Sequence, residues 1–299
     1  MNRTYFKTGI ILMWLALPLT ALRYWRVWDE LPARMATHFN AAGQPNGWMS
    51  RETSLGFALG LTIFLLTLFS IVLYVAQRKS ADGRSAWALL GFFYLVLFVV
   101  YKVNASVVDH ALYGTPVEVG WVLVTIPVGV IGLMIVFIGS HRGTAFPLDS
   151  SEVIAEETHA GRAWAPLFIL PAIPVLGAFV CIPNRTLRFA MLLIFVILAI
   201  TFGMAWDGFR YRFSKSGLEI FTIGFRLRSI PLSQIREYAV SPWNAIGGYG
   251  IRGLGESRAY VWGSKGVRIK TTAGEVFLGH NEPQRIVQDL DTIKQFAHS

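Results

Sequence analysis

The segment TSLGFALGLTIFLLTLFSIVLYVAQ, residues 53–77, contains no charged side chain. A helix rises about 1.5 Å per residue, so about 20 apolar residues are enough to cross the hydrocarbon core of a bilayer. Five further segments are similarly apolar. We assign the six spans to residues 5–28, 53–77, 85–108, 119–140, 163–182 and 187–206. The sequence therefore predicts a polytopic α-helical membrane bundle of six spans.

The composition supports a membrane protein with one additional small domain. Hydrophobic residues make up 54% of the 299 positions and charged residues only 15%, and the mean hydropathy is +0.48. A six-span domain at 1–206 leaves residues 207–299 for a second unit. Cys181 is the single cysteine, which excludes an intrachain disulfide and argues against a redox or cysteine–metal role.

Prolines modify two of the predicted spans. Pro18 predicts a kink in the first, because proline removes a backbone donor from the helix. Pro166, Pro171 and Pro174 predict a bent or broken fifth span. Broken helices can frame a transport site, but a matching interruption in a second repeat is missing from this sequence.

The distribution of lysine and arginine predicts the orientation, since cytoplasmic loops carry the excess of these residues. One side collects Arg3, Lys7, Arg78, Lys79, Arg84, Arg142 and Arg162. The other side collects the smaller set Arg34, Arg51, Lys102, Arg185 and Arg188. Both termini are therefore expected in the cytoplasm. The net charge of +9 follows partly from this bias, so membrane lipids are expected as partners and nucleic acid is not.

The loop at 29–52, DELPARMATHFNAAGQPNGWMSRE, is expected to face outward and to be compact. Proline and glycine in the sequence GQPNG favour tight turns, and Asn40 can hydrogen-bond nearby backbone. Phe39 and Trp48 are expected to pack the loop onto the bilayer interface.

This loop carries a family signature. Residues 1–80 resemble the DUF1648 family, whose signature reads like LP...PTHFNA.G.P.GW. The matched positions are Leu31, Pro32, Thr37, His38, Phe39, Asn40, Gly43, Pro45, Gly47 and Trp48, and Ala36 replaces the usual proline. The resemblance implies a bacterial cytoplasmic-membrane protein. One understood member type is the membrane immunity protein of a sporulation-delaying toxin system, which also tethers a transcriptional repressor. The remaining spans here show no clear match to that protein.

Beyond residue 206, short alternating segments separated by glycine turns predict a cytoplasmic β domain. Strands are expected at 210–213, 218–221, 225–230, 238–240, 260–262, 267–271 and 275–278, with hairpin turns at 214–217 and 272–274. A closing helix should begin at Pro283 and bury Ile286, Leu290 and Ile293. The segment from Gly247 to Pro283 resembles the bacterial pleckstrin-homology-like domains, which implies a barrel closed by that helix.

Two features of this domain have competing interpretations. Arg210, Arg212, Lys215, Arg226 and Arg228 are predicted to form a basic face for lipid or a partner, with a solvated strand face as the alternative. Residues 248–253 satisfy the GxGxxG pattern, but the residues that follow have strand character, so nucleotide binding is not expected. The acidic segment 150–158 is expected to be a solvated linker that is able to dock the basic tail.

Catalytic motifs are missing from the sequence. It contains no HExxH, GxSxG or P-loop motif, and we expect neither an enzyme nor a cofactor. Asp29, Glu30 and His38 would have to meet Asp109 and His110 to form a metal or proton site, and solvated juxtamembrane residues are the simpler interpretation.

The sequence thus favours a sensor, immunity or regulatory protein. The outer loop would bind an extracellular peptide or envelope ligand through His38, Phe39, Asn40, Gly43, Pro45, Gly47 and Trp48, and the β domain would bind a cytoplasmic protein. The alternatives are a scaffold that organises other membrane proteins and, less favoured, a transporter.

Overall fold

The computed structural model describes residues 3–40, 44–79, 83–117, 120–139, 153–254 and 256–296. The chain divides into two compact units. The first comprises Met1–Arg78, Ala86–Leu133 and Ile182–Leu193, and the second comprises Lys79–Ser85, Met134–Cys181 and Ile194–Ser299.

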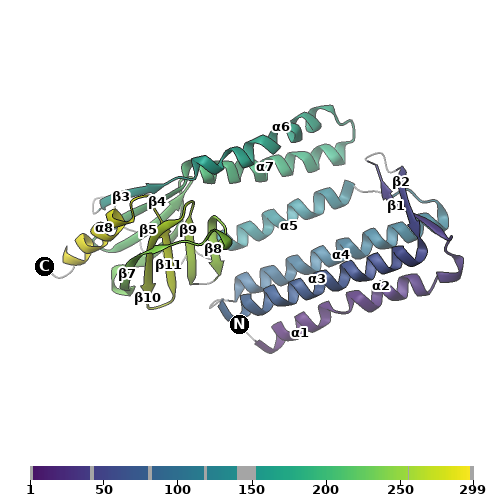
Figure 1. The fold of residues 1–299 in the computed structure, drawn as a ribbon, viewed down its shortest axis with the longest axis horizontal. Coiled ribbons are helices and arrows are strands. Elements are labelled where there is room, and N and C mark those ends of the chain that lie inside the picture. The colour runs from purple at the N-terminus through teal and green to yellow at the C-terminus, as the bar shows by residue number, and fades with distance from the viewer. Residues whose placement is uncertain are drawn as a thin grey trace. The chain divides into compact units, whose positions relative to one another are not determined.

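The long helices have the length and composition of membrane spans. The elements are α1 (Arg3–Met13), α2 (Ala16–Trp25), α3 (Arg51–Lys79), α4 (Arg84–Tyr113), α5 (Gly120–Gly139), α6 (Pro166–Cys181) and α7 (Arg185–Asp207), shown in Figure 1. Among the described residues, five segments are long and apolar enough to cross a membrane: Arg3–Trp25, Arg51–Arg78, Arg84–Tyr113, Arg162–Cys181 and Arg185–Asp207. A shorter apolar stretch, Gly120–Val136, lies in α5. These helices indicate a multi-pass membrane protein.

The predicted kink in the first span is present one turn before Pro18. Helices α1 and α2 are separated at Trp14 and Leu15, whose amides bond to the carbonyls three residues earlier at 3.0 Å. Pro18 has no N–H for the carbonyl of Trp14, which accepts from Leu17 at 3.1 Å instead. The missing donor therefore produces the break.

Of the two outcomes expected for the fifth span, a bend or a break, the break is not found in α6. Pro171 and Pro174 lie inside a continuous helix that begins at Pro166. Proline fits the first position of a helix, and membrane helices tolerate internal prolines by local adjustment.

A short hairpin connects α2 to α3. A 3₁₀ turn η1 (Trp28–Glu30) precedes strands β1 (Arg34–Phe39) and β2 (Pro45–Ser50), which pair antiparallel from Arg34–Ser50 to Phe39–Pro45. The register shifts around His38. The loop expected to be compact is therefore a β-hairpin with an irregularity at its signature histidine.

The second unit contains two sheets. The four-stranded sheet has the order β3-β4-β5-β6, and the five-stranded sheet has the order β7-β10-β11-β9-β8. The strands are β3 (Val153–His159), β4 (Phe209–Ser214), β5 (Gly217–Thr222), β6 (Phe225–Pro231), β7 (Ile235–Pro242), β8 (Gly250–Leu254), β9 (Ser257–Val261), β10 (Lys265–Thr271) and β11 (Glu275–Gly279). All pairs are antiparallel except β9–β11. The sheets are not closed, so the predicted barrel is wrong.

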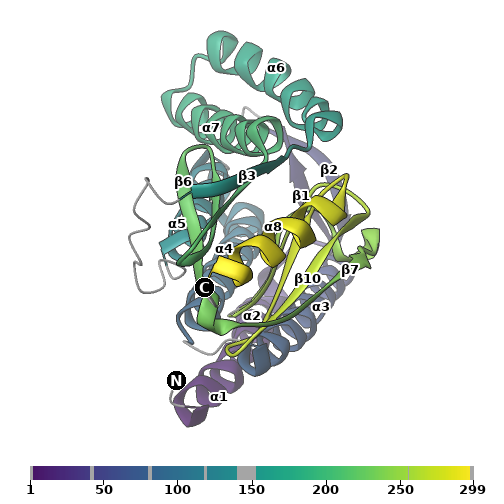
Figure 2. The same cartoon turned by 90° about the vertical axis from the view of Figure 1, so that its left-hand side faces the viewer.

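The hydrophobic core of this unit lies between the sheets and the C-terminal helix α8 (Pro283–Phe296). Figure 2 shows α8 lying along strands of both sheets, and it contacts β3, β4, β7 and β10. Ile286, Leu290 and Ile293 are fully buried, as their helical spacing predicted.

Strand β3 overturns the linker assignment of residues 150–158. Glu156 lies opposite Arg212, and His159 lies opposite Phe209. The sheet therefore includes a strand that precedes both α6 and α7 in the sequence. Part of the linker, 150–152, lies outside the described residues.

Candidate functional site

The β1–β2 hairpin is fixed at its tip by Asn40. Its backbone N–H donates to the carbonyl of Gln44 at 2.9 Å, and its Oδ1 accepts from the N–H of Gln44 at 2.9 Å. Asn40 therefore closes the turn through both its backbone and its side chain. Gly43 lies outside the described residues.

The base of the hairpin is packed onto three helices. Met35 is fully buried, and Leu31 is buried with it in a cluster with Tyr24, Ala58, Val107 and Val108. Phe39 packs against this cluster, and its ring meets that of His110 edge-on at 5.0 Å. Phe39 therefore anchors the hairpin to protein, which departs from the expected contact with the bilayer interface.

Polar contacts hold the same region. Arg51 donates to the carbonyl of Trp28 at 3.1 Å, and its guanidinium lies 4.9 Å from the centre of the Trp28 ring. The buried hydroxyls of Tyr24 and Ser54 are 3.0 Å apart. These contacts tie the hairpin's entry and exit to the helices.

Asp109 and His110 have partners other than Asp29, Glu30 and His38, with which a metal site was considered. Asp109 is ion-paired with Arg23, and Nδ1 of His110 lies 2.8 Å from the carbonyl of Thr115. Among the described residues, no group of three or more His, Cys, Asp or Glu side chains could hold a metal ion.

The signature residues divide into supporting and exposed positions. A β-carbon on residue 47 would lie 2.8 Å from Cβ of His38, so Gly47 is required by this close approach. Pro45 pairs with Phe39. His38 is exposed, and 53% of Trp48 is exposed. A large exposed aromatic and an exposed imidazole on the same braced hairpin are suited to recognition.

The predicted basic face of the second unit is largely neutralised. Arg212 and Arg210 lie 2.7 and 3.5 Å from the carboxylate of Glu156. Arg226 pairs with Glu219 at 2.9 Å. Because of these ion pairs, the surface of the four-stranded sheet carries both positive and negative charges.

The two other basic residues have different surroundings. Arg228 is 8% exposed and pairs with Glu256 at 2.7 Å. Lys215 lies in the turn between β4 and β5, with its Nζ 5.9 Å from the centre of the Phe296 ring. Arg228 is therefore part of the protein interior, and Lys215 remains exposed.

A buried polar cluster in the second unit was not found from the sequence. His159 is 2% exposed, and its Nε2 accepts from the N–H of Trp262 at 3.2 Å. Burial, with a smaller contribution from the nearby His280, lowers the pKa of His159 to about 4. Its Nδ1 has no hydrogen-bond partner among the described residues. His159 is thus a neutral imidazole that joins β3 to the end of β9.

His280 and Asp289 complete this cluster. His280 Nε2 lies 3.2 Å from Glu157, and its Nδ1 accepts from the N–H of Glu282 at 3.1 Å. Burial, and then the charge of Glu157, raise the pKa of Asp289. Only the pairing of β3 brings these residues together, which is why sequence spacing gave no signal for them.

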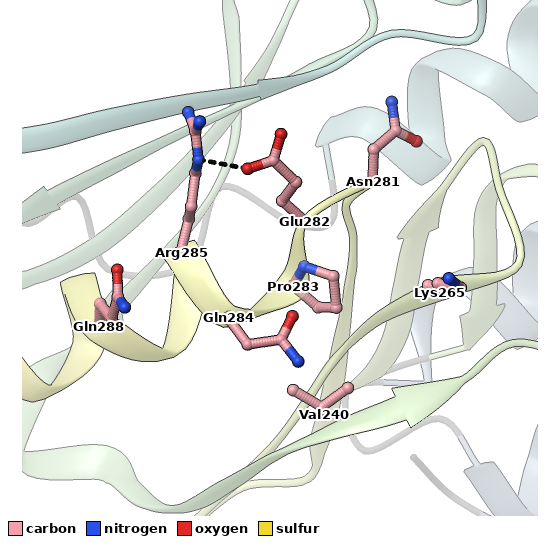
Figure 3. Close-up of a pocket in the computed structure, with 8 residues that line it drawn as sticks. All are labelled: Val240, Lys265, Asn281, Glu282, Pro283, Gln284, Arg285 and Gln288. Carbon is pink, nitrogen blue, oxygen red and sulfur yellow. Dashed lines mark ion pairs between the residues drawn. The ribbon is translucent and has the colours of Figure 1, made fainter.

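An open groove of about 580 Å³ lies at the start of α8 (Figure 3). Asn281, Glu282, Pro283, Gln284, Arg285 and Gln288 line one side, and Val240 of β7 and Lys265 of β10 line the other. Glu282 pairs with Arg285 at 2.7 Å. β7 is an edge strand of its sheet, so the groove adjoins backbone that can accept a further extended segment.

The hairpin coincides with a known family segment. Residues 11–63 match the family described as Domain of unknown function (DUF1648). This DUF1648 segment contains α2, the whole hairpin and the first half of α3. It confirms the resemblance of the N-terminal part. No curated protein and no solved structure matches the chain.

The GxGxxG segment runs into strands, as the residues that follow it predicted. Gly248 and Gly250 precede and begin β8, and Gly253 lies within it. A phosphate-binding glycine loop requires a helix whose N-terminus follows it. Here the segment continues into strands β8 and β9.

Proposed function

We propose that this protein is a non-enzymatic bacterial membrane sensor or immunity protein. The β1–β2 hairpin binds an extracellular peptide or envelope ligand, and the second unit binds a cytoplasmic protein. Both termini lie in the cytoplasm, and the chain crosses the bacterial inner membrane six times. The observation that carries the proposal is the exposed pair His38 and Trp48 on a hairpin that is rigidly supported within the DUF1648 segment.

The supports favour a preformed recognition surface. Phe39 and Met35 are packed against the helix ends, and Arg51 is bonded to the turn that precedes β1. A surface held in this way loses little conformational freedom on binding, which leaves more of the contact energy for affinity. Tryptophan is enriched among the residues that dominate binding interfaces.

The second unit is proposed to be a pleckstrin-homology-like interaction module. Two sheets covered by a C-terminal helix support this assignment. The groove beside β7 and the start of α8 is the partner site we favour, because exposed Val240 supplies apolar contact and Gln284 and Gln288 supply hydrogen-bonding groups. The ion pairs of Arg210, Arg212 and Arg226 argue against a strongly basic lipid-binding face there.

The ligand-binding role is tested by Trp48→Ala and His38→Ala in a cell that depends on the protein for protection or signalling. Both variants should lose the phenotype while remaining at wild-type abundance in the membrane, because the two side chains are exposed and support no core. Trp25→Ala is the matched control, since Trp25 is 76% exposed on α2. Full activity of both hairpin variants would overturn the ligand-binding role.

The partners are identified by photo-crosslinking in the native membrane. A crosslinking residue at position 48 should capture a secreted or envelope molecule, and one at position 284 should capture a soluble regulator. Capture by position 284 of integral membrane neighbours alone would instead support the scaffold alternative. Position 25 again serves as the lipid-exposed control.

A further inference from the structure

The turn between β5 and β6 contains an isoleucine in a conformation that isoleucine rarely adopts. Ile223 has φ +46°, and it is the only non-glycine residue with positive φ among those the structure describes. Gly224 follows with φ +74°, so both central residues of the turn have positive φ, a pattern that strongly favours Asn-Gly or Gly-Gly. The left-handed conformation is unfavourable for a residue with a β-carbon, and branching at that carbon makes it more so.

Packing within the protein covers only part of Ile223. Ile223 is 38% exposed, and Phe225, the next large residue, is 63% exposed. A strained and exposed isoleucine beside an exposed phenylalanine indicates a surface that contacts something outside the folded chain.

The turn is attached to the end of a membrane span. The N–H of Ile223 donates to Oδ2 of Asp207 at 2.8 Å, and Thr222 Oγ1 donates to the carbonyl of Gly208 at 2.7 Å. Asp207 is the last residue of α7, and Arg210 lies 3.9 Å from the same carboxylate. These contacts fix the turn at one end of the span.

The side chain of Ile223 extends along α7 away from that polar end. A β-carbon on Gly203 would lie 3.4 Å from Cδ1 of Ile223, with no other described atom so close. Gly203 precedes Asp207 by about one helical turn, or about 5.4 Å along the axis. The isoleucine therefore reaches the apolar part of the span.

Aromatic and basic residues at the Asp207 end of α7 are typical of a span end at the membrane interface. Trp206 is 54% exposed and stacks on Phe202 at 5.6 Å. The guanidinium of Arg162, where the preceding span begins, lies 5.8 Å from the centre of the Trp206 ring. Tryptophan and arginine are enriched at span ends, where headgroups meet hydrocarbon. The Cδ1 end of Ile223 lies at Gly203, which is nearer the middle of the span than Trp206.

We propose that the turn Thr222–Phe225 inserts Ile223 and Phe225 into the headgroup–acyl boundary of the bilayer. The occupant of this surface is membrane lipid, as the continuity of the turn with the lipid-facing surface of α7 indicates. The inserted turn fixes the four-stranded sheet at the membrane surface.

The test is a depth measurement on the full-length protein in vesicles of phosphatidylcholine and phosphatidylglycerol. Cys181→Ser removes the natural thiol, and Ile223→Cys or Phe225→Cys carries a nitroxide spin label. The comparison position is Ala273→Cys, in the exposed turn between β10 and β11 at the opposite end of that hairpin from His280. Oxygen collisions report lipid, and collisions with a water-soluble nickel chelate report solvent.

Labels at 223 and 225 should show several-fold lower nickel-chelate accessibility than the label at 273, and higher oxygen accessibility. Nickel-chelate accessibility equal to that at 273 would place the turn in water and overturn the proposal. Exclusion of both reagents would show that protein covers the turn, which also overturns it. The near-ultraviolet circular dichroism of each labelled protein establishes that the fold is retained, and the two positions provide independent readings.

Discussion

At the scale of single residues, His159 connects the strand before α6 to the five-stranded sheet. Its buried ring accepts a hydrogen bond from Trp262 and is held beside His280. A β-carbon on Gly279 would lie 2.8 Å from Cδ2 of His159, so the neighbouring strand leaves space only for glycine. The imidazole therefore fills a site shaped for its neutral form.

This burial predicts a stability that depends on pH. The folded-state pKa of His159 is about 4, below the ordinary value of 6.5, because burial disfavours the charged ring. The contribution of the neutral His159 ring to the free energy of unfolding is fully present above pH 6.5. It is lost as the pH falls towards 4, because the unfolded chain binds the proton first. The loss amounts to about 3 kcal/mol when each pKa unit is taken as about 1.4 kcal/mol.

Thermal unfolding of the detergent-solubilised protein between pH 7.5 and pH 4 measures this loss. His159→Gln keeps an acceptor for Trp262 without a titrating group, so its stability should vary less with pH across that interval. Asp289 has a raised pKa and acts in the opposite direction, gaining stability as its carboxyl is protonated. It is present in both proteins and leaves their difference unaffected. An unchanged pH slope in the variant would contradict the assignment to His159.

Gly47 gives a second prediction at the residue scale. Gly47→Ala places a β-carbon 2.8 Å from Cβ of His38, which is attached to strand backbone and cannot rotate away. The hairpin should lose about 1–3 kcal/mol of local stability. Trypsin should then cleave faster at Arg34 and Arg51, at the two ends of the hairpin.

Gly60→Ala is the matched control, because its β-carbon would meet no described atom within 4 Å. Alanine is favoured over glycine inside a helix by about 1 kcal/mol, so this variant should be cleaved at the wild-type rate or more slowly. Equal cleavage of the two variants would contradict the close approach at Gly47.

At the scale of elements, local patterns identified most of the structure. Alternating apolar residues predicted seven strands that match β4–β7 and β9–β11, and the proline and apolar spacing predicted α8. β8 was missed because Gly250 and Gly253 within it weaken the alternation and resemble a loop. β3 was missed because its partner β4 follows two intervening spans. Acidic residues in a short connection also resemble a solvated linker.

Strand β3 predicts that the C-terminal segment is incomplete without it. A soluble fragment of residues 208–296 lacks the strand that pairs with β4, and it also lacks His159 beside Trp262. Joining residues 153–159 to its C-terminus through a long glycine–serine linker should raise the melting temperature by several degrees, because the edge becomes paired and the histidine site filled.

A matched control carries Ala155→Pro and Glu157→Pro in the joined strand, since proline cannot donate to the ladder. Its melting temperature should equal that of the unextended fragment. Equal melting of all three fragments would show that β3 contributes nothing to the stability of the sheet. The same reasoning makes deletion from residue 207 unsuitable as a functional test, because the deletion would leave β3 without its partner.

At the scale of the whole molecule, the β3–β4 pair constrains the path of the chain through a membrane. β3 ends at His159 and β4 begins at Phe209, and α6 and α7 lie between them. Two strands of one sheet must be on the same side of the bilayer, so the chain must cross it an even number of times between them. The segments that contain α6 and α7 are each long and apolar enough to supply one crossing. The apolar pattern of the sequence predicts six spans but no such link between their ends.

The role of α5 then decides where the hairpin and the β strands lie. The first span, α3 and α4 are each long and apolar enough to cross the bilayer, which would give three crossings before it. α5 has 20 residues, and at about 1.5 Å per residue its length of about 30 Å equals the thickness of the hydrocarbon core. If α5 crosses, the N-terminus and the sheets share one side and the hairpin faces the other. A non-crossing α5 would place the hairpin and the sheets on the same side.

Single-cysteine labelling distinguishes these arrangements. In a Cys181→Ser background, Asn46→Cys reports the hairpin, Ala273→Cys reports the sheets and Arg3→Cys reports the N-terminus; all three positions are exposed. A membrane-impermeant maleimide should label position 46 in intact spheroplasts, and positions 3 and 273 only in inverted vesicles. Labelling of 46 and 273 from the same side would exclude α5 as a span. Ligand recognition by the hairpin would then occur on the side of the sheets, and signalling across the membrane would be unnecessary.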